Sequence, residues 1–476
     1  MTREVDYDVR GPVSEIRIKP PAGTPLIEKW AYTYTDVLNV ATLTDSASRL
    51  TTYGYDSLDR LTSADHPTLP PPLDTLPDLE TFAYDGVGNR TMSGYAHDAN
   101  HRMRTSPGHS YDYDDDGNTK VRDPGTSGQA SYTWDLENRL TAYASGATSA
   151  AYTQDPFARR LRKSVGSTTT WYLWSGDRLL AEYSGAGTRT TRYTPLDGFA
   201  PAQMAVPSGG SELIYDVHAD RLDTPRVMTS SAGAVVWQAA YEAYGQAHLA
   251  TGLSTPLNVR LPGQYLDAES SLHYNFFRTY DPGTGRYVSA DPIGQAGGIN
   301  VYRYARNNPL RFFDPFGLEE GSASNVKKRK AVAQWALDQN GSTDFSYDAN
   351  LSPQYPAGSN KCSGFTCAAA ASSGADTTVT VPDGEGGTKD RCPTAAELGR
   401  GSVPDWRLLG PGESPEAGDI MADPFTGGVP GVTGHAAVVV PDGSGGTTTQ
   451  GAHANRVGPP GADHPSNPRY RRYTGD

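Results

Sequence analysis

The sequence predicts a multidomain protein that is mainly β over its first two thirds and α+β over its last third. It contains 52 Gly, 36 Pro and 28 Tyr among 476 residues. Apolar residues make up 36% of the chain, below the ~45–50% of ordinary globular domains, and this mixture is typical of many short strands joined by turns. Of the 28 Tyr, 24 lie at or before Tyr304, whereas all three Cys lie beyond it. At least two regions of different construction are therefore joined in one chain.

The formal net charge of −13 excludes the usual way of coating nucleic acid or anionic membranes, which depends on basic patches. No stretch approaches the roughly 18 apolar residues of a spanning helix. The first residues show no apolar signal core. We therefore expect no nucleic-acid partner, no membrane span and, if the protein leaves its cell, a dedicated delivery component. Three Cys are too few for a disulfide framework, and we expect no cofactor and no metal.

A degenerate repeat in the first 200 residues predicts a series of strand hairpins. The pair Tyr55-Asp56 recurs at Tyr84-Asp85 and Tyr113-Asp114, 29 residues apart each time. Asp and the residues that follow it favour turns, and the flanking alternation places aromatic side chains on one strand face. One hairpin cannot bury that face alone, so neighbouring hairpins should form an extended sheet. We interpret these Tyr and Asp residues as scaffold. Weaker copies occur at Tyr34, Trp134-Asp135 and Gln154-Asp155.

These motifs resemble the YD repeats of the Rhs/teneurin/Tc-toxin superfamily, in which such repeats wind into a hollow β-shell. Residues 215–245, 261–294 and 297–318 closely resemble the Rhs-associated core, the segment that plugs the shell. The resemblance implies a YD-repeat shell fragment over residues 1–200 and the core over residues 201–318. Family members carry more repeats than this chain, so we expect a fragment of a shell.

The end of the core resembles a self-cleavage motif, Asp314-Pro-Phe-Gly-Leu318. Relatives with this motif cut themselves just after the Leu and use two Asp residues, which correspond here to Asp291 and Asp314. When two carboxylates lie close together, the charge of one disfavours ionisation of the other. One can therefore serve as acid and the other as base. Arg286 is a candidate to tune the pair. The alternative is that Asp-Pro and Gly-Leu are ordinary turn residues.

The last third is predicted to be a polar linker, residues 319–325, followed by an α+β domain over residues 326–476. Cys362 opens an Ala-rich helix, where the helix dipole favours a reactive thiolate. Further expected elements are a helix over 326–341 and strands over 418–422, 435–440 and 447–455. The order of a Cys on a helix, a His at a strand start and a polar residue on the next strand is typical of a nucleophile, a base and an orienting group.

This arrangement resembles the papain-like, NlpC-type cell-wall peptidases and the related CHAP-type amidases. The matching strings are Cys362-Ser-Gly-Phe, Gly418-Asp-Ile, Gly434-His435 and Ala452-His453-Ala. The resemblance implies that Cys362 is the nucleophile, His435 the general base and His453 the group that orients the imidazole. Gln450 and Asn455 are alternatives for the third position.

The combined expectation is an Rhs toxin whose C-terminal domain, released after Leu318, cuts peptide or amide bonds of peptidoglycan in competitor bacteria. It would be a secreted or delivered effector, cytoplasmic in the producer and active in the target periplasm, with a cognate immunity protein and a secretion-system partner. The strings His-x-Glu and Cys-x-x-Cys of zinc deaminases are absent from the tail. Two alternatives are a cytosol-acting cysteine protease, deamidase or transglutaminase-like toxin, and a non-catalytic YD-repeat binding fragment.

Overall fold

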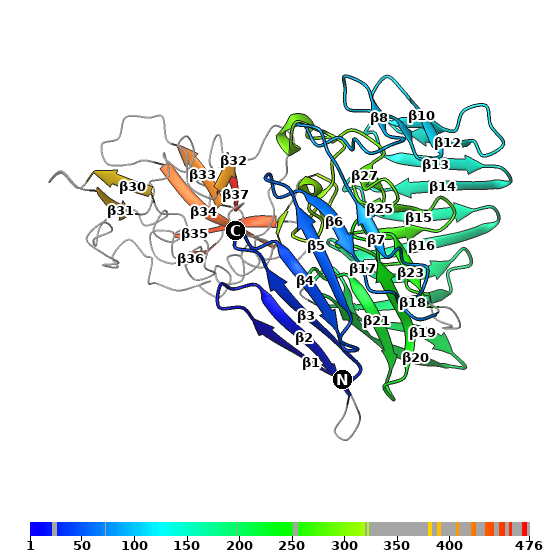
Figure 1. Ribbon diagram of the computed structural model, residues 1–476, viewed down its shortest axis with the longest axis horizontal. Helices are drawn as coiled ribbons and strands as arrows, with labels where there is room; N and C mark the ends of the chain where they lie inside the picture. Colours follow the sequence, from blue (N-terminus) through cyan, green and yellow to red (C-terminus); the bar gives the residue numbers. More distant parts are fainter. Residues whose placement is uncertain are drawn as a thin grey trace. The chain divides into compact units, whose positions relative to one another are not determined.

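The computed structural model divides into two compact units, Met1–Glu320 and Gly321–Asp476. In the first unit it describes residues 1–20, 26–71, 73–196, 198–250 and 256–318. In the second unit it describes the backbone of the strands alone. Both described parts are built from β-strands, apart from two short 3-10 helices (Figure 1). The prediction of a mainly β protein is confirmed for the first unit.

The first unit contains two large antiparallel sheets whose strands follow chain order. The seven-stranded sheet consists of β1 (Thr2–Tyr7), β2 (Val13–Lys19), β3 (Glu28–Tyr34), β4 (Val40–Asp45), β5 (Leu50–Tyr55), β6 (Leu61–Asp65) and β7 (Leu79–Thr81). The sixteen-stranded sheet consists of β8 (Ala96–His97), β9 (Met103–Ser106), β10 (His109–Tyr113), β11 (Thr119–Arg122), β12 (Ala130–Trp134), β13 (Leu140–Ser145), β14 (Thr148–Gln154), β15 (Arg160–Val165), β16 (Thr168–Ser175), β17 (Arg178–Ser184), β18 (Arg189–Pro195), β19 (Pro201–Ser208), β20 (Ser211–Ala219), β21 (Pro225–Ser230), β22 (Val235–Tyr241) and β23 (Ala247–Leu249).

A third, four-stranded sheet begins the inner part of the unit. It consists of β24 (Tyr265–Asp267), β25 (Leu272–Asn275), β26 (Arg278–Asp281) and β27 (Arg286–Tyr287). The 3-10 helices η1 (Gly294–Gly297) and η2 (Ala305–Asn307) and the short strand β28 (Phe312–Phe313) follow. Residues 201–249, assigned by resemblance to the core, continue the sixteen-stranded sheet as β19 to β23. In this structure the chain leaves the sheet for the interior only after β23.

The Asp of each YD repeat closes its hairpin turn. At Asp56, Oδ1 accepts hydrogen bonds from the backbone N–H groups of Leu58 and Arg60, each at 3.0 Å, and Oδ2 accepts from Arg60 Nε at 2.7 Å. Turns at Asp45 and Asp98 follow the same pattern. Sequence reasoning missed these two, because no aromatic residue precedes either Asp. The pattern also recurs at Asp85, Asp135 and Asp155.

The Tyr of each repeat joins its hairpin to the preceding one. The Tyr55 hydroxyl donates to the Val40 carbonyl oxygen at 2.8 Å, and the Tyr84 hydroxyl donates to that of Leu61 at 2.9 Å. The Tyr113 hydroxyl donates to the Met103 carbonyl oxygen at 3.0 Å. The Tyr and Asp of the repeats thus hold successive hairpins in register, as a scaffold role requires.

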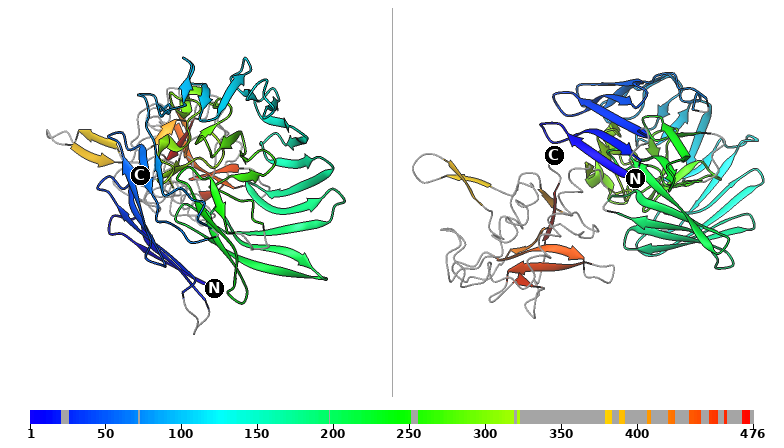
Figure 2. Two further views of the ribbon diagram at one scale, coloured as in Figure 1. Left: turned by 45° about the vertical axis from the view of Figure 1, so that its right-hand side comes forward. Right: turned by 90° about the horizontal axis from the view of Figure 1, so that it is seen from below.

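Residues 256–318 form the interior of the first unit, on the inner side of the curved sheets (Figure 2). Tyr132, Tyr143 and Tyr152 of the large sheet share one core cluster with Leu272 and Val288. Polar contacts tie the same two parts together: the Tyr302 hydroxyl donates to the Gly117 carbonyl oxygen at 2.8 Å. We call residues 1–250 the shell and residues 256–318 the plug.

The second unit contains a six-stranded antiparallel sheet in the order β32-β37-β33-β34-β35-β36 and a two-stranded ribbon. The predicted strand over 418–422 corresponds to β33, that over 435–440 to β34 and that over 447–455 to β35. The predicted helices lie outside the described residues. The strands of the unit are β29 (Gly321–Ser322), β30 (Val379–Pro382), β31 (Thr388–Arg391), β32 (Trp406–Leu408), β33 (Ile420–Pro424), β34 (Gly434–Pro441), β35 (Thr447–Ala452), β36 (Val457–Gly458) and β37 (Arg469–Tyr473).

Candidate functional site

Asp291 and Asp314 meet at one buried arginine in the plug. Arg278, at the start of β26, lies 3.0 Å from Asp291 Oδ2 through Nη1 and 2.7 Å from Asp314 Oδ2 through Nη2. The exposed fraction is 3% for the Arg278 side chain and 1% for that of Asp314. Buried charges persist when they are paired and hydrogen-bonded, and the guanidinium here provides that pairing for both carboxylates.

Asp314 also holds the end of the plug. Its Oδ1 accepts from the backbone N–H of Gly317 at 2.8 Å and from that of Leu318 at 3.0 Å. Arg278 Nε donates to the Gly317 carbonyl oxygen. Gly317 has a φ of 73°, which favours glycine, and a methyl group added there would lie 2.7 Å from the Asn275 carbonyl oxygen. The turn before Leu318 is therefore fixed by the same residues that bring the two carboxylates together.

The Asp291 carboxylate and the Leu318 carbonyl group both lie next to Gly297. A methyl group added to Gly297 would lie 2.4 Å from Asp291 Oδ2 and 3.1 Å from the Leu318 carbonyl oxygen. The carboxylate and the carbonyl therefore border one small space that the absence of a side chain at Gly297 leaves open. Asp291 Oδ1 accepts from the Ile293 N–H at 3.0 Å, which orients the carboxylate.

Tyr287 and Asn275 complete the surroundings of Asp314. The Tyr287 hydroxyl donates to Asp314 Oδ2 at 2.8 Å and accepts from Asn275 Nδ2 at 2.9 Å. The Arg278 guanidinium carbon lies 3.5 Å from the centre of the Tyr287 ring, a cation–π contact. The named contacts of the two carboxylates come from residues 275–318, which belong to the plug.

The two carboxylates affect the pKa values of Arg278 and Tyr287. Burial by itself lowers the pKa of Arg278, but the negative charge of Asp291, nearby Tyr287 and the charge of Asp314 together raise it above its usual value. Burial and the charge of Asp314 raise the pKa of Tyr287 well above its usual value. Tyr287 therefore keeps its proton, and Arg278 keeps its charge.

Arg286, the residue that the sequence offered for tuning the pair, makes its named hydrogen bonds elsewhere. It donates to Asn89 Oδ1 at 3.2 Å, to His97 Nε2 at 3.0 Å and to the His101 carbonyl oxygen, all three in the shell. Arg278 takes the place between the carboxylates. The missed signal is the string "YNFFRTY" (274–280), because a lone charge in so aromatic a strand must be buried and paired.

The three residues predicted for thiol chemistry belong to the second unit. His435 is the second residue of β34, where its backbone pairs with Asp423 of β33. Gln450 on β35 pairs with Val438. Cys362, His453 and Asn455 lie outside the described residues, so the arrangement of the proposed nucleophile, base and orienting group stays a prediction.

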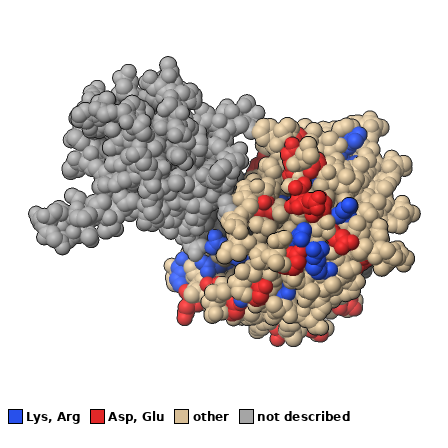
Figure 3. Space-filling model, turned by 90° about the horizontal axis from the view of Figure 1, so that it is seen from above, with Lys and Arg blue, Asp and Glu red and all other residues tan. Residues whose placement is uncertain are grey.

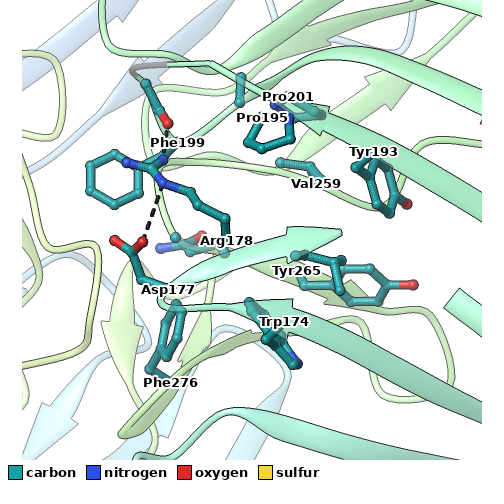
Figure 4. Close-up of a pocket in the computed structure, with 15 residues that line it drawn as sticks. Trp174, Asp177, Arg178, Tyr193, Pro195, Phe199, Pro201, Val259, Tyr265 and Phe276 are labelled. Atoms are coloured by element: carbon teal, nitrogen blue, oxygen red, sulfur yellow. Dashed lines mark hydrogen bonds and ion pairs between the residues drawn. The ribbon is translucent and has the colours of Figure 1, made fainter. Parts of the chain in front are cut away.

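A second candidate, a cavity of about 50 Å³, lies between the shell and the plug. Arg178 lies near the Asp177 carboxylate, at 3.2 Å, and its guanidinium lies 5.0 Å from the centre of the Phe199 ring (Figure 4). Trp174, Tyr265 and Phe276 line another side. The Asp177 carboxylate is paired with Arg178, and the cavity is otherwise lined largely by aromatic and apolar side chains, so we do not assign a reaction to it.

The described residues hold no group of three or more His, Cys, Asp or Glu side chains that could bind a metal ion. No helix among them is long and apolar enough to cross a membrane. On the face of the first unit shown in Figure 3, acidic and basic side chains are mixed, without a single basic patch.

Comparison with known proteins relates part of the shell to a known family. Residues 214–249, from β20 to β23, match the family described as RHS protein.

Two curated relatives are similar in sequence. The double-stranded DNA deaminase toxin A of Burkholderia cenocepacia is 30% identical in an alignment 324 residues long, and this alignment covers 60% of this chain and 22% of the relative. The toxin protein Tse5 of Pseudomonas aeruginosa is 31% identical in an alignment 263 residues long, and this alignment covers 47% of this chain and 20% of the relative. The chain spans about a fifth of the length of these relatives.

A solved structure supports the fold. A mutant form of the Photorhabdus luminescens Tc holotoxin pore aligns with a TM-score of 0.50 at 19% identity, over 66% of this chain and 18% of the other. At this identity the likeness concerns the fold alone, and it agrees with the β-shell expected from the YD repeats.

Proposed function

We propose that this chain is an Rhs toxin that cuts itself after Leu318 and thereby releases residues 319–476 as its active part. The observation that carries the proposal is the buried contact of Arg278 with both Asp291 and Asp314, beside the bond to be cut. A backbone turn can form without a buried arginine and a second carboxylate. Their presence at this turn therefore indicates a role beyond turn formation.

The two carboxylates have different surroundings and, in this proposal, different tasks. Asp314 Oδ2 receives Arg278 and Tyr287, and its Oδ1 receives two backbone N–H groups. Four donors suit an ionised carboxylate, which only accepts. Asp314 therefore holds the substrate backbone in position. Asp291, which shares the space at Gly297 with the Leu318 carbonyl, is the group that transfers protons.

The proposed reaction is a hydrolysis. Asp291 accepts a proton from a water molecule while the water oxygen attacks the Leu318 carbonyl carbon. The bond between this carbon and the nitrogen of Glu319 then breaks, and Asp291 passes the proton to that nitrogen. The products are a Leu318 carboxylate and a free amine on Glu319. Positioning of the carbonyl by Asp314 contributes because reacting groups held in place react faster than free ones.

Expression of the full chain tests this step. We expect wild type to appear as two fragments, residues 1–318 and 319–476, with Glu319 as the new N-terminus. Asp291→Asn and Asp314→Asn should remain whole. Asp281→Asn is the matched control, because the Asp281 carboxylate contacts its own turn at Gly283. An uncut wild type, or cutting that persists in both variants, would overturn the proposal.

For the released part, we propose a Cys/His hydrolase in which Cys362 attacks, His435 acts as base and His453 orients it. Support comes from the spacing of the motifs and from the strands β33, β34 and β35, which adjoin in the order that the resemblance implies. Peptidoglycan peptide or amide bonds are the proposed substrate. A neutralising immunity protein and a delivery component are the proposed partners.

Other activities for the released part are suggested by the relatives and by the same Cys and His residues. One relative is named a DNA deaminase toxin, but the tail lacks the zinc-binding strings of that class. The remaining rivals are a thiol enzyme that acts in the cytosol and a chain that only binds. No rival has support from the described residues beyond that of the proposed hydrolase.

Growth of bacteria that express the full chain separates these possibilities. Wild type and the matched control Cys392→Ala should cause lysis when exported to the periplasm, while Cys362→Ala should be harmless. Harm confined to the cytoplasm would replace peptidoglycan with a cytosolic target. Equal growth of all strains in both compartments would end the thiol-toxin proposal.

A further inference from the structure

Arg286 is a buried cation whose named side-chain hydrogen bonds all end on shell residues. It is 5% exposed. Its three acceptors are on His97 of β8 and on Asn89 and His101, which lie in the turns on either side of that strand. Among the described residues, no ion pair involves Arg286. We call Arg286 and these three shell residues the latch. A buried guanidinium without acceptors is strongly unfavourable, so Arg286 stays buried only when the shell turns are in place.

The latch is connected to the cleavage site because Arg286 is directly followed in the chain by Tyr287. Tyr287, the next residue, donates its hydroxyl to Asp314 and stacks its ring on Arg278. Its N–H donates to the Tyr302 carbonyl oxygen at 3.0 Å. A change in the backbone position of Arg286 therefore moves Tyr287, which contacts the charged groups of the site.

Residues 300–302 form a second connection between the shell and the cleavage site. Asn300 Nδ2 donates to Asn89 Oδ1 at 2.8 Å, so Asn89 accepts from both connections. Between Asn300 and Tyr302, the Val301 carbonyl oxygen accepts from the Asp291 N–H at 2.9 Å. The shell thus contacts the plug at residues 286, 300 and 302. The backbone at these residues in turn holds Tyr287 and Asp291 in position.

We infer that Arg286 is a positioning residue that makes self-cleavage depend on closure of the shell over the plug. This inference rests on the proposed self-cleavage after Leu318. Before the shell turns close, Arg286 has no buried acceptors, and Tyr287 and Asp291 are not held against Arg278. After closure the latch fixes both, and the bond after Leu318 is cut. Such an order would keep the toxic part attached until its container is formed.

The test follows newly made full-length chains in cell-free translation. The measured quantities are the rate of cleavage after Leu318 and the resistance of the shell to added protease. We expect Arg286→Met and Asn89→Ala to become protease-resistant like wild type but to be cut at least about tenfold more slowly, since small misplacements cost that much. Tyr152→Phe is the control, because it removes one hydrogen bond between shell and plug at Glu269, outside both connections.

The outcomes separate this inference from the function on which it rests. A protease-resistant Arg286→Met that is cut at the wild-type rate overturns the latch while self-cleavage stands. If that variant fails to fold, Asn89→Ala decides in the same way from the shell side. If wild type is not cut, both ideas fall. The pH profile distinguishes positioning from direct action: loss of a positioning Arg286 lowers the rate at every pH, whereas loss of a direct partner of the carboxylates shifts the profile.

Discussion

Arg160 and Asp267, 107 residues apart in the chain, form an almost fully buried ion pair between shell and plug. Nη1 of Arg160 on β15 lies 2.6 Å from Oδ1 of Asp267 on β24, and the side chains are 1% and 0% exposed. The guanidinium carbon lies 4.4 Å from the ring centre of Tyr152 and 4.2 Å from that of Tyr274. Shell and plug are thus joined by charge as well as by their shared apolar core.

Removal of Asp267 should destabilise the first unit strongly. In Asp267→Ala the Arg160 guanidinium stays buried without its partner, and breaking one side of a buried pair costs about 3–5 kcal/mol. Urea unfolding followed by tryptophan fluorescence measures the loss. Asp6→Ala, which removes an exposed partner of Arg17, is the control and should cost much less, because exposed ion pairs contribute little to stability. Replacement of both partners, Arg160→Met with Asp267→Leu, should recover part of the loss. A double variant as unstable as Asp267→Ala would contradict this account.

Gly297 should tolerate no side chain if Asp291 acts on the Leu318 carbonyl. In Gly297→Ala the new methyl group would lie within 2.4 Å of Asp291 Oδ2, so the carboxylate must move. We expect a folded chain that stays uncut on a denaturing gel. Gly86→Ala adds a methyl group where no atom lies within 4 Å and should be cut normally. Efficient cleavage of Gly297→Ala would mean that the space beside this glycine is not the reaction site.

The sequence predicted the shell and the two carboxylates better than it predicted their surroundings. The turn at Asp56 could be predicted from the sequence because its hydrogen bonds join residues no more than four apart. The choice between Arg278 and Arg286 could not, because it depends on how β25, β26 and β27 pair. In that register Arg278 lies opposite Asn275, whereas Arg286 lies opposite Asp281. Arg278 stands among four aromatic residues in "YNFFRTY" (274–280), whereas Arg286 has one in "GTGRYVS" (283–289). These strings indicate that Arg278 is buried, but only the paired strands place it against Asp314.

Tyr287 should affect cleavage in two separable ways. Tyr287→Phe removes the hydrogen bond to Asp314 Oδ2 but keeps the ring under Arg278, so we expect the cleavage rate to fall about tenfold, the equivalent of one hydrogen bond. Tyr287→Leu removes the stacking as well and should be cut far more slowly. Timed gels of newly translated chains measure both rates. Equal rates for the Phe and Leu variants would show that the ring does not position Arg278.

Acid should destabilise the first unit through buried histidines that fold in the neutral form. Burial lowers the pKa of His218 to about 4, and burial together with the charge of Arg260 lowers the pKa of His273 well below its usual value. Unfolded histidine binds a proton near a pKa of about 6.5, so between pH 6.5 and 4 the unfolded chain holds more protons than the folded one. The free energy of unfolding must therefore decrease as the pH falls through this window.

Thermal unfolding at pH 7, 6, 5 and 4 measures this dependence. His218 contributes through a buried ring whose Nε2 lies 2.9 Å from Thr229 Oγ1. We expect His218→Gln, which can keep a hydrogen bond to Thr229 but does not titrate, to lose less stability between pH 6.5 and 4 than wild type. His109→Gln is the control, because His109 is exposed and lies beside Asp123 on the surface. A His218→Gln variant with the same pH dependence as wild type would assign the acid sensitivity to other groups, since only a titrating ring at position 218 can produce the difference.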